Sequence, residues 1–452
     1  MKKYILPLIA TGALFSLSAK AETIFDAMAE AYRTNPDLQA QRAYLRSVDE
    51  NVAIAKSGYR PSVSLSGQYS DSKRDNPDNT AEKGGVSTSL GATVSQPLFS
   101  GFSTVNSVKA ADSEVRSEQY NLSDYEQEIL LSVSEAYLNV VRDQAIVGLQ
   151  KNNEKLLKKQ LDETQERYRV GELTRTDVAQ SKSSHAEAVA NRIEAEGNLE
   201  VSKAIYKQII GKSPENLTEP DNIHKFLPSS FEKALQYTMD NNFNLLQSKE
   251  ALKSKEYAVK ANYGALSPQL SAVGTAGKNR NNPKHYGDPT SNVDEYSWGL
   301  NATIPLYDAG EDRARIRKSK YAKWQAQEGV LSAQRAAVSS VTGSWEAMTS
   351  YDAKIKALEE QVDANKIALN GVKKEEALGN RTIIDVLDAY QTLLNSQVDV
   401  VKARREYYLS AMQVMQAMGK LTAKNLKLNV DLYNAKQHYK DTRNKWLSTS
   451  VD

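Results

Sequence analysis

The sequence lacks cysteine altogether and has only four histidines in 452 residues. Without cysteine it cannot form a disulfide scaffold, a thiolate zinc site or an iron–sulfur cluster, and it has no cysteine nucleophile. The histidines are too scattered for the spacing of a metal site. No catalytic triad, phosphate-binding loop or cluster of ligands is visible. The sequence therefore predicts a protein that is not an enzyme and that carries no cofactor and no metal.

Long apolar runs and a strong net charge are also missing. The mean hydropathy is −0.57, which excludes a bundle of apolar transmembrane helices. The formal net charge of +2 offers no basic field for nucleic acid, so we expect no nucleic-acid partner. One apolar stretch, residues 5–17, follows two lysines and precedes the small-x-small site Ala19-Lys20-Ala21. This pattern is typical of a cleaved signal peptide, here residues 1–21, and predicts export.

The rest of the chain contains an internal repeat of about 208 residues. Short landmarks recur at an offset of 207 or 208, which chance would not produce so many times. The matched pairs include Asn35-Pro36 with Asn242-Phe243, Gln96-Pro97-Leu98-Phe99 with Ile304-Pro305-Leu306-Tyr307, and Gly171 with Gly379. We divide the chain into a first repeat at 22–213, a linker at 214–230, a second repeat at 231–421 and a C-terminal segment at 422–452.

Each repeat is expected to begin with a helix, near residues 25–57 and 231–263, and to continue with a β-hairpin. The hairpins are expected at about 61–98 and 268–307, where the apolar period changes from 3.6 to 2. Val63, Leu65 and Tyr69 alternate with serines, for example. The runs are long enough for tilted membrane strands, which need roughly 9–11 residues. The alternative is a soluble hairpin packed on a helical body.

Long helical stretches follow each hairpin, at about 102–210 and 311–418. Each is broken once by a turn at a glycine, Gly171 or Gly379, and has polar outer faces that are typical of coiled coils. A periplasmic coiled-coil scaffold with soluble hairpins is therefore an alternative function. If the strands do enter a membrane, four of them cannot close a barrel, since the smallest closed barrels have about eight. Several chains would have to share one barrel, because open strand edges are costly in lipid.

The whole exported chain resembles the TolC-like family of outer-membrane efflux and type I secretion channel-tunnels of Gram-negative bacteria. The resemblance rests on the order of the elements, on Tyr59-Arg60-Pro61, and on the two turn motifs Val170-Gly171-Glu172-Leu173-Thr174 and Gly379-Asn380-Arg381-Thr382. It implies an α+β fold in which a homotrimer forms a shared 12-stranded β-barrel in the outer membrane and a periplasmic α-helical barrel. The resemblance also implies that the protein has no chemistry of its own.

The resemblance also implies partners and a use. A periplasmic adaptor (membrane fusion) protein would join the duct to an inner-membrane pump of the ABC, RND or MFS type, and the strands would contact outer-membrane lipid. The duct would passively conduct substrates delivered by that pump. The turn motif at Gly171 is slightly more typical of secretion than of small-molecule efflux, and one duct can serve both.

In this family two rings of carboxylates, one helical turn apart, close the periplasmic end of the tunnel. Asp385 and Asp388 occupy the matching positions, and their i, i+3 spacing puts them on one face of a helix. Rings of like charge in a narrow pore favour cations. For Asp388 the alternative is an ordinary solvated helix face. Asp385 also fits a capping box with Thr382, as Asp177 does with Thr174, and the pattern favours capping for both aspartates.

A latch on the closed state is implied as well. Arg381 matches the family arginine that helps to hold the entrance closed, and Asp177 and Thr176 match its partners on the neighbouring coil. The family prototype has a tyrosine in this latch where this sequence has Glu376. An additional acid near Asp177 would weaken the closed state or pair with Arg381 itself.

Overall fold

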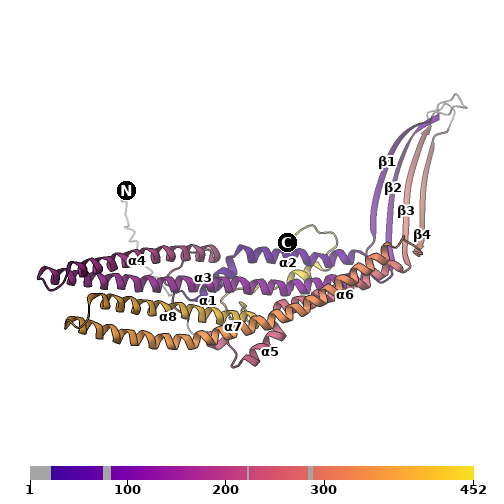
Figure 1. Ribbon diagram of the computed structural model, residues 1–452. Helices are drawn as coiled ribbons and strands as arrows, with labels where there is room; N and C mark the ends of the chain where they lie inside the picture. The colour runs from indigo at the N-terminus through magenta and orange to yellow at the C-terminus, as the bar shows by residue number, and fades with distance from the viewer. Residues whose placement is uncertain (1–21, 75–82, 221–222, 284–288, 452) are drawn as a thin grey trace, which may run out of the picture. The chain divides into compact units, whose positions relative to one another are not determined.

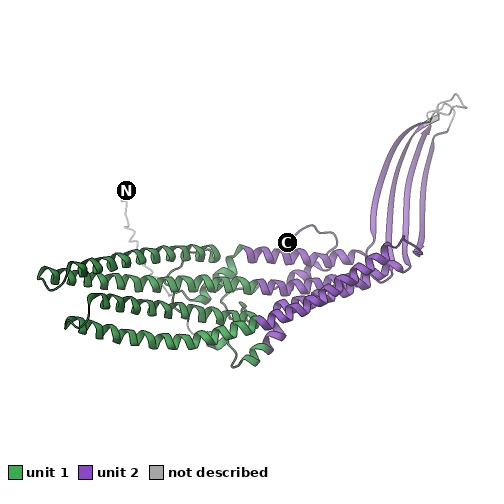
Figure 2. Cartoon of the chain, viewed as in Figure 1, with its two compact units in different colours: residues 1–36, 126–235, 340–432 green, residues 37–125, 236–339, 433–452 purple. Residues whose placement is uncertain are grey.

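The computed structural model describes residues 22–74, 83–220, 223–283 and 289–451, so the predicted signal peptide at 1–21 lies outside the described residues. The chain divides into two compact units, each made of three segments (Figure 2). Unit 1 comprises residues 1–36, 126–235 and 340–432, and unit 2 comprises residues 37–125, 236–339 and 433–452. The helices α3 (Ser103–Arg169) and α7 (Glu311–Ala377) contribute to both.

Unit 1 is helical. Besides its parts of α3 and α7 it contains α1 (Ile24–Thr34), α4 (Arg175–Ile210) and α8 (Ile383–Ala417), with the short 3₁₀ turn η1 (Ile223–Phe226). The last turns of α8 are deeply buried: Met412 and Met415, and Met418 directly after the helix, are fully inaccessible. Flexible methionine side chains fill irregular gaps between helices well. Helix α8 is thus the central packing element of this unit.

Buried tyrosines attach the linker between the repeats, and Glu22 at the start of the described chain, to the helices of unit 1. Tyr137 on α3 donates a hydrogen bond to the carbonyl oxygen of Thr218 at 2.7 Å, and Tyr206 on α4 donates one to Glu22 Oε1 at 2.8 Å. Lys212 forms an ion pair with the same Glu22 oxygen. Burial raises the pKa of both tyrosine hydroxyls, so they remain neutral donors.

Unit 2 contains α2 (Pro36–Ser57), α6 (Phe243–Tyr263), the 3₁₀ turn η2 (Gly264–Leu266) and α9 (Gln437–Thr442); α5 (Phe231–Asn241) crosses the boundary. The prediction of one unbroken helix at the start of each repeat is wrong. Each is interrupted at an asparagine with extended backbone, Asn35 (φ −63°, ψ 121°) and Asn242 (φ −62°, ψ 121°). The same interruption at equivalent positions of both repeats supports the internal duplication.

Four antiparallel strands of unit 2 form one sheet in the order β1-β2-β3-β4 (Figure 1). They are β1 (Ser62–Arg74), β2 (Lys83–Ser100), β3 (Gln269–Pro283) and β4 (Ser291–Thr303). Strand β4 therefore ends at Thr303, before the expected end of the second hairpin at about residue 307. Within this chain, β1 and β4 are the edge strands.

The register gives the sheet two chemically different faces. Residues directly opposite each other in an antiparallel ladder share a face. The row Val63–Val94–Gly274–Trp298 and the row Leu65–Ala92–Ala276–Tyr296 belong to one side, which we call the apolar face. The intervening rows form the polar face, which consists mainly of serine, threonine and glycine: Ser62–Ser95–Val273–Gly299, Ser64–Thr93–Thr275–Ser297 and Ser66–Gly91–Gly277–Glu295.

The last part of the C-terminal segment, residues 433–452, packs on helices of unit 2. His438 lies 2.9 Å from the carboxylate of Asp49 on α2, and Tyr439 donates a 2.6 Å hydrogen bond to Asp112 on α3. Arg443 donates a second bond to Asp112. Asp49 is only 1% exposed, and burial raises the pKa of its carboxyl group. Tyr439 also packs against the apolar cluster of Val48, Val52, Ala111 and Val115, so polar and apolar contacts together hold the tail.

The junction between the sheet and the helices of unit 2 is unusually tight. The backbone of Gly101, at the end of β2, has φ +60° and lies against that of Gly264 in η2. A Cβ atom on Gly101 would lie 2.4 Å from the carbonyl oxygen of Gly264. Phe102, directly after Gly101, also has positive φ. The matching pair in the second repeat, Ala309-Gly310, has positive φ at both residues.

Among the described helices, none is both long enough and apolar enough to cross a membrane.

Candidate functional site

Two helical turns lie at the same end of unit 1 (Figure 2). One joins α3 to α4 and the other joins α7 to α8. Each is built on a glycine with positive φ, Gly171 at +83° and Gly379 at +80°. In both, the glycine N–H and the next N–H bond back to carbonyl groups of the preceding helix, as in a Schellman motif. The two turns therefore have the same construction, as their shared motif predicts.

The helices after these turns begin with capping boxes. Thr174 Oγ1 accepts from Asp177 N at 3.2 Å, and Asp177 Oδ2 accepts from Thr174 N at 2.9 Å. Thr382 and Asp385 make the same reciprocal bonds at the start of α8, at 3.4 and 2.9 Å. These are the caps expected from the Thr-x-x-Asp pattern. Because the Thr382 backbone and hydroxyl donate to Asp385, the pKa of this carboxyl group lies below its usual value.

Asp385 and Asp388 lie on the side of α8 that faces away from the core of this unit. Asp388 is exposed and Asp385 is partly exposed. The intervening positions are buried against α3, α4 and α7, in a cluster formed by Leu157, Ala188, Leu369, Ile383, Val386, Leu387 and Tyr390. The apolar positions of α8 fix its rotation, so both carboxylates are directed outward together.

The residues expected to form the latch have other partners within this chain. Arg381 Nε donates to Glu375 Oε2 at 3.0 Å, and its terminal nitrogen lies 4.0 Å from Asp385. Thr176 is exposed on the first turn of α4. Half of the Arg381 side chain remains exposed, which leaves it accessible to a further partner.

Glu376 joins α7 to α3. Its carboxylate accepts a 2.7 Å hydrogen bond from Arg167, and only 11% of its side chain is exposed. Arg167 also bonds Glu172 in the α3–α4 turn at 3.2 Å. These acceptors raise the pKa of the guanidinium. Glu376 thus connects the two helical hairpins through an arginine that sequence reasoning did not identify.

A signal for Arg167 was present in the sequence. Helix α3 ends with two arginines, Arg167 and Arg169, whereas α7 ends with Glu375 and Glu376 at comparable distances before the turn glycine. Opposite charges at equivalent positions of two repeats suggest contact between the repeats. A further hydrogen bond at this end of unit 1 lies within the second helical hairpin, where Lys373 on α7 donates to the hydroxyl of Tyr390 on α8 at 3.0 Å.

A groove of about 650 Å³ lies between α3 and α7 beside this ion pair. Its walls are strongly charged and carry both signs. They include Lys159, Asp162, Glu163, Glu166, Arg167, Lys373 and Glu376, with Val386 of α8.

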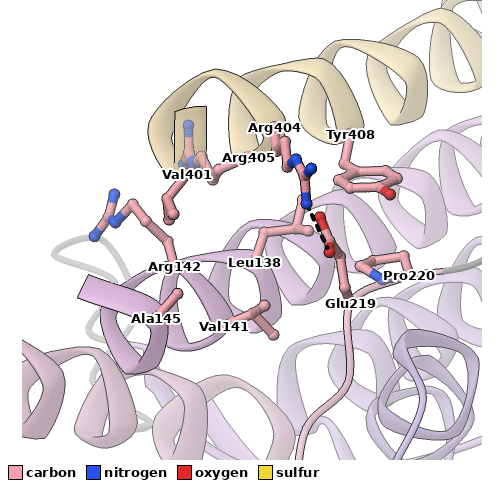
Figure 3. A pocket seen from close by; sticks show the side chains of 10 residues that line it. All are labelled: Leu138, Val141, Arg142, Ala145, Glu219, Pro220, Val401, Arg404, Arg405 and Tyr408. Atoms are coloured by element: carbon pink, nitrogen blue, oxygen red, sulfur yellow. Dashed lines mark hydrogen bonds and ion pairs between the residues drawn. The ribbon is translucent and has the colours of Figure 1, made fainter. Parts of the chain in front are cut away.

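A smaller pocket of about 120 Å³ lies between α3, α8 and the linker (Figure 3). Arg142, Arg404 and Arg405 line it, but each pairs with a carboxylate. Arg404 bonds Glu219 of the linker at 3.4 Å and Glu359 at 2.7 Å, and Arg405 bonds Glu135 at 2.9 Å. The pocket therefore anchors the linker and presents little unneutralised charge to a ligand. No group of side chains suited to a metal ion occurs among the described residues.

Comparison with known proteins identifies the class. The family model "Outer membrane efflux protein" matches residues 27–212 and 234–420, so each repeat matches separately. The chain belongs to this family. It is an outer-membrane protein that extends into the periplasm, in a family of channels and not of enzymes. The alternative of a periplasmic coiled-coil scaffold does not agree with this membership.

Individual relatives cover nearly the full length. The chain is 32% identical to the outer membrane efflux protein BepC of Brucella suis over 440 residues, 97% of this chain and 94% of BepC. It is 25% identical to TolC of Escherichia coli, over 94% of this chain and 88% of TolC. In fold it is similar to CusC (TM-score 0.77, 14% identity, 92% of this chain and 98% of CusC). VceC from Vibrio cholerae is comparably similar (TM-score 0.75, 18% identity, 88% and 96%).

Proposed function

We propose that this outer-membrane channel works as a homotrimeric export duct, in which three copies share one closed 12-stranded barrel. The observation that carries the proposal is the sheet of four strands, with edge strands β1 and β4 and with one apolar and one polar face. Unpaired strand edges cannot face lipid, because each unsatisfied backbone group costs several kcal/mol there. Pairing β4 of one copy with β1 of the next removes every edge.

The two faces suit this arrangement. The apolar face carries highly exposed side chains, such as Trp298 at 89% and Leu65 at 73%. Facing lipid, these side chains would be buried, and the polar face would line a water-filled interior.

The paired helical turns are the proposed gate. In a trimer, Asp385 and Asp388 would each form a ring of three carboxylates at the periplasmic end, and the rings would attract cations. The support is the outward direction of both side chains on α8. Within one chain the Thr382 donors also lower the pKa of the Asp385 carboxyl group, which favours its charged form.

The latch is proposed to have two parts. Arg381 would reach Asp177 and Thr176 of the partner subunit, for which its exposure leaves it available. Glu376 would hold the two hairpins of one subunit together through Arg167. Opening would require both sets of contacts to break. The half-exposed contacts of Arg381 are weak, whereas the Arg167–Glu376 pair, with only 11% of the Glu376 side chain exposed, holds more strongly.

A periplasmic adaptor and an inner-membrane pump of the ABC, RND or MFS type would deliver the cargo. Two relatives are named for protein secretion: "Alkaline protease secretion protein AprF" of Pseudomonas aeruginosa and "Proteases secretion protein PrtF" of Dickeya chrysanthemi. BepC and TtgC of Pseudomonas putida are named for efflux. The chain therefore suits both uses, and a deletion strain tested for missing secreted proteins and for drug sensitivity would separate them.

Purified protein reconstituted in planar bilayers tests the duct directly. We expect discrete single-channel conductance and a cross-linked trimer in detergent. A monomer without conductance would contradict the proposal.

A further inference from the structure

We propose that Lys278 and Arg280 on β3 form a site for the phosphate groups of outer-leaflet lipid headgroups. The inference rests on the proposed membrane placement of the sheet. It concerns the part of the apolar face nearest the hairpin loops, a region that the gate and the latch do not use.

The register places both cations on the apolar face. Lys278 lies opposite Leu90 of β2 and Asp294 of β4, and Arg280 lies opposite Thr88 and Asn292. Their rows directly continue the rows of Leu65 and Tyr296 that define this face. Two residues along a strand are about 7 Å apart, so the two side chains can contact one headgroup.

The position of Lys278 and Arg280 along β3 corresponds to the outer boundary of the membrane. The strand ends near residues 62, 100, 269 and 303 continue into helices, whereas the other ends are joined by the hairpin connections. Because the helices extend into the periplasm, the hairpin ends face the outside. Going outward along the face, Leu300 is followed by Trp298 and Tyr296, and then by the row that contains Lys278. Exposed tryptophan and tyrosine typically mark the level of the headgroups.

The charges at this boundary are only partly neutralised within the chain. Lys278 lies 3.5 Å from Asp294, but both side chains are more than half exposed, so this ion pair is weak. Arg280 Nε donates a 3.0 Å hydrogen bond to Asn292, a neutral partner, and Arg280 forms no ion pair with another residue in the described part of the chain. Guanidinium and ammonium groups beside an apolar surface are suited to a phosphate whose acyl chains cover that surface.

The continuity with the apolar face favours a lipid over free phosphate. A lipid would bury Val63 and Val94, which lie in the row of Trp298, under its chains while its headgroup reaches Lys278 and Arg280. Free phosphate would gain only the electrostatic contact, at an exposed position where water and salt screen it.

Native mass spectrometry of the purified full chain in non-ionic detergent tests the site. The probes are bis-phosphorylated lipid A, the same lipid after enzymatic removal of its phosphates, and inorganic phosphate. The test variant is Lys278→Gln with Arg280→Gln. The matched control is Lys203→Gln with Lys356→Gln, which removes two lysines from exposed helical i, i+3 and i, i+4 pairs. Arg280→Lys keeps the charge and loses only the planar guanidinium.

We expect the unmodified chain to bind the phosphorylated lipid at least about tenfold more tightly than the dephosphorylated lipid. The test variant should lose this preference, and the control and Arg280→Lys should keep it. Equal binding by the test variant, no preference for phosphate, or equally tight binding of inorganic phosphate would each overturn the proposal.

Flotation with phosphatidylcholine vesicles separates this inference from the proposed duct. If the unmodified chain does not float, the membrane placement fails and the site fails with it. If it floats and conducts but shows no headgroup preference, only the lipid site is wrong. The circular dichroism spectrum and flotation of the test variant check its folding, and Arg280→Glu provides a second variant in which repulsion should abolish binding of the phosphorylated lipid.

Discussion

Arg167, in the last turn of α3, donates a 2.7 Å hydrogen bond to Glu376, in the last turn of α7. The two residues are 209 positions apart and belong to different repeats. Their ion pair links the two helical hairpins of unit 1 at the end that carries the turn glycines. Glu376 is nearly buried, whereas Arg167 is about one-third exposed. This geometry makes the pair the strongest candidate for an intrachain restraint on opening.

Glu376→Gln should loosen this restraint. It removes the charge but keeps the shape of the side chain, so we expect a cost of about 1 kcal/mol for a partly exposed charged hydrogen bond. The open probability in single-channel recordings should rise severalfold. Glu166→Gln is the control, because its partner Arg169 is an exposed i, i+3 neighbour. An equal rise in the control would show that the pair does not restrain the gate.

Neutralising Asp385 and Asp388 should abolish block by multivalent cations. We choose Asp385→Asn with Asp388→Asn because asparagine can keep part of the capping geometry while removing the charge. The measurement is block of the reconstituted channel by a trivalent cation. Glu200→Gln removes an exposed carboxylate of α4 that pairs with its helix neighbour Lys203, outside the proposed gate and latch, and should leave block intact. Unchanged block in the double variant would refute the proposed rings.

Removing a cap should destabilise one helix start locally. Thr382→Ala loses the side-chain bond to Asp385 N and should cost about 1 kcal/mol. Amide hydrogen exchange should accelerate severalfold in the first turn of α8 and remain unchanged at the start of α4. Thr174→Ala should give the reverse pattern, so each variant serves as a control for the other.

The stability of the start of α8 should fall at low pH, because its cap includes the ionised carboxyl group of Asp385. The folded-state pKa of the Asp385 carboxyl group lies below its unfolded value, so the ionised form stabilises the helix start above the unfolded pKa, near 3.8. This contribution should disappear as the pH falls through the lower, folded pKa. Hydrogen exchange at the start of α8, corrected for intrinsic rates, should therefore become faster only in strong acid. In Asp385→Asn this pH dependence should be absent.

Gly101→Ala should destabilise the junction between β2 and α3 strongly. The new Cβ would clash with the Gly264 carbonyl oxygen at 2.4 Å, and φ would remain at +60°. We expect a loss of about 3 kcal/mol from strain and overpacking. Gly171→Ala has positive φ but no atom within 4 Å of its Cβ, so it should cost only about 1 kcal/mol. Gly148→Ala, inside α3 and also without a close neighbour, should stabilise slightly. Thermal unfolding of the three variants would test this ranking.

The sequence was most informative where structure follows from local pattern. The alternation of Val63, Leu65 and Tyr69 with serine predicted a strand with two distinct faces, and Thr-x-x-Asp predicted both caps. The breaks at Asn35 and Asn242 were missed, because the apolar period continues across one residue of extended backbone. The Arg167–Glu376 pair was missed for a different reason. Contacts between residues 209 positions apart depend on how helices pack, which periodicity along one helix does not reveal.

The polar face of the sheet has a consequence for transport. Ten of the twelve residues in its three rows are serine, threonine or glycine, none of which projects far from the backbone, and the other two are Val273 and Glu295. Electrical resistances along a pore add in series, and a wall of such short side chains contributes little to the total. Enlarging Ser64 or Thr275 should therefore hardly change conductance, whereas small changes at the helical turns should dominate it. Selection between solutes would then take place at the helical turns, where the solutes enter the duct. The sheet would form a wide exit that does not select between them.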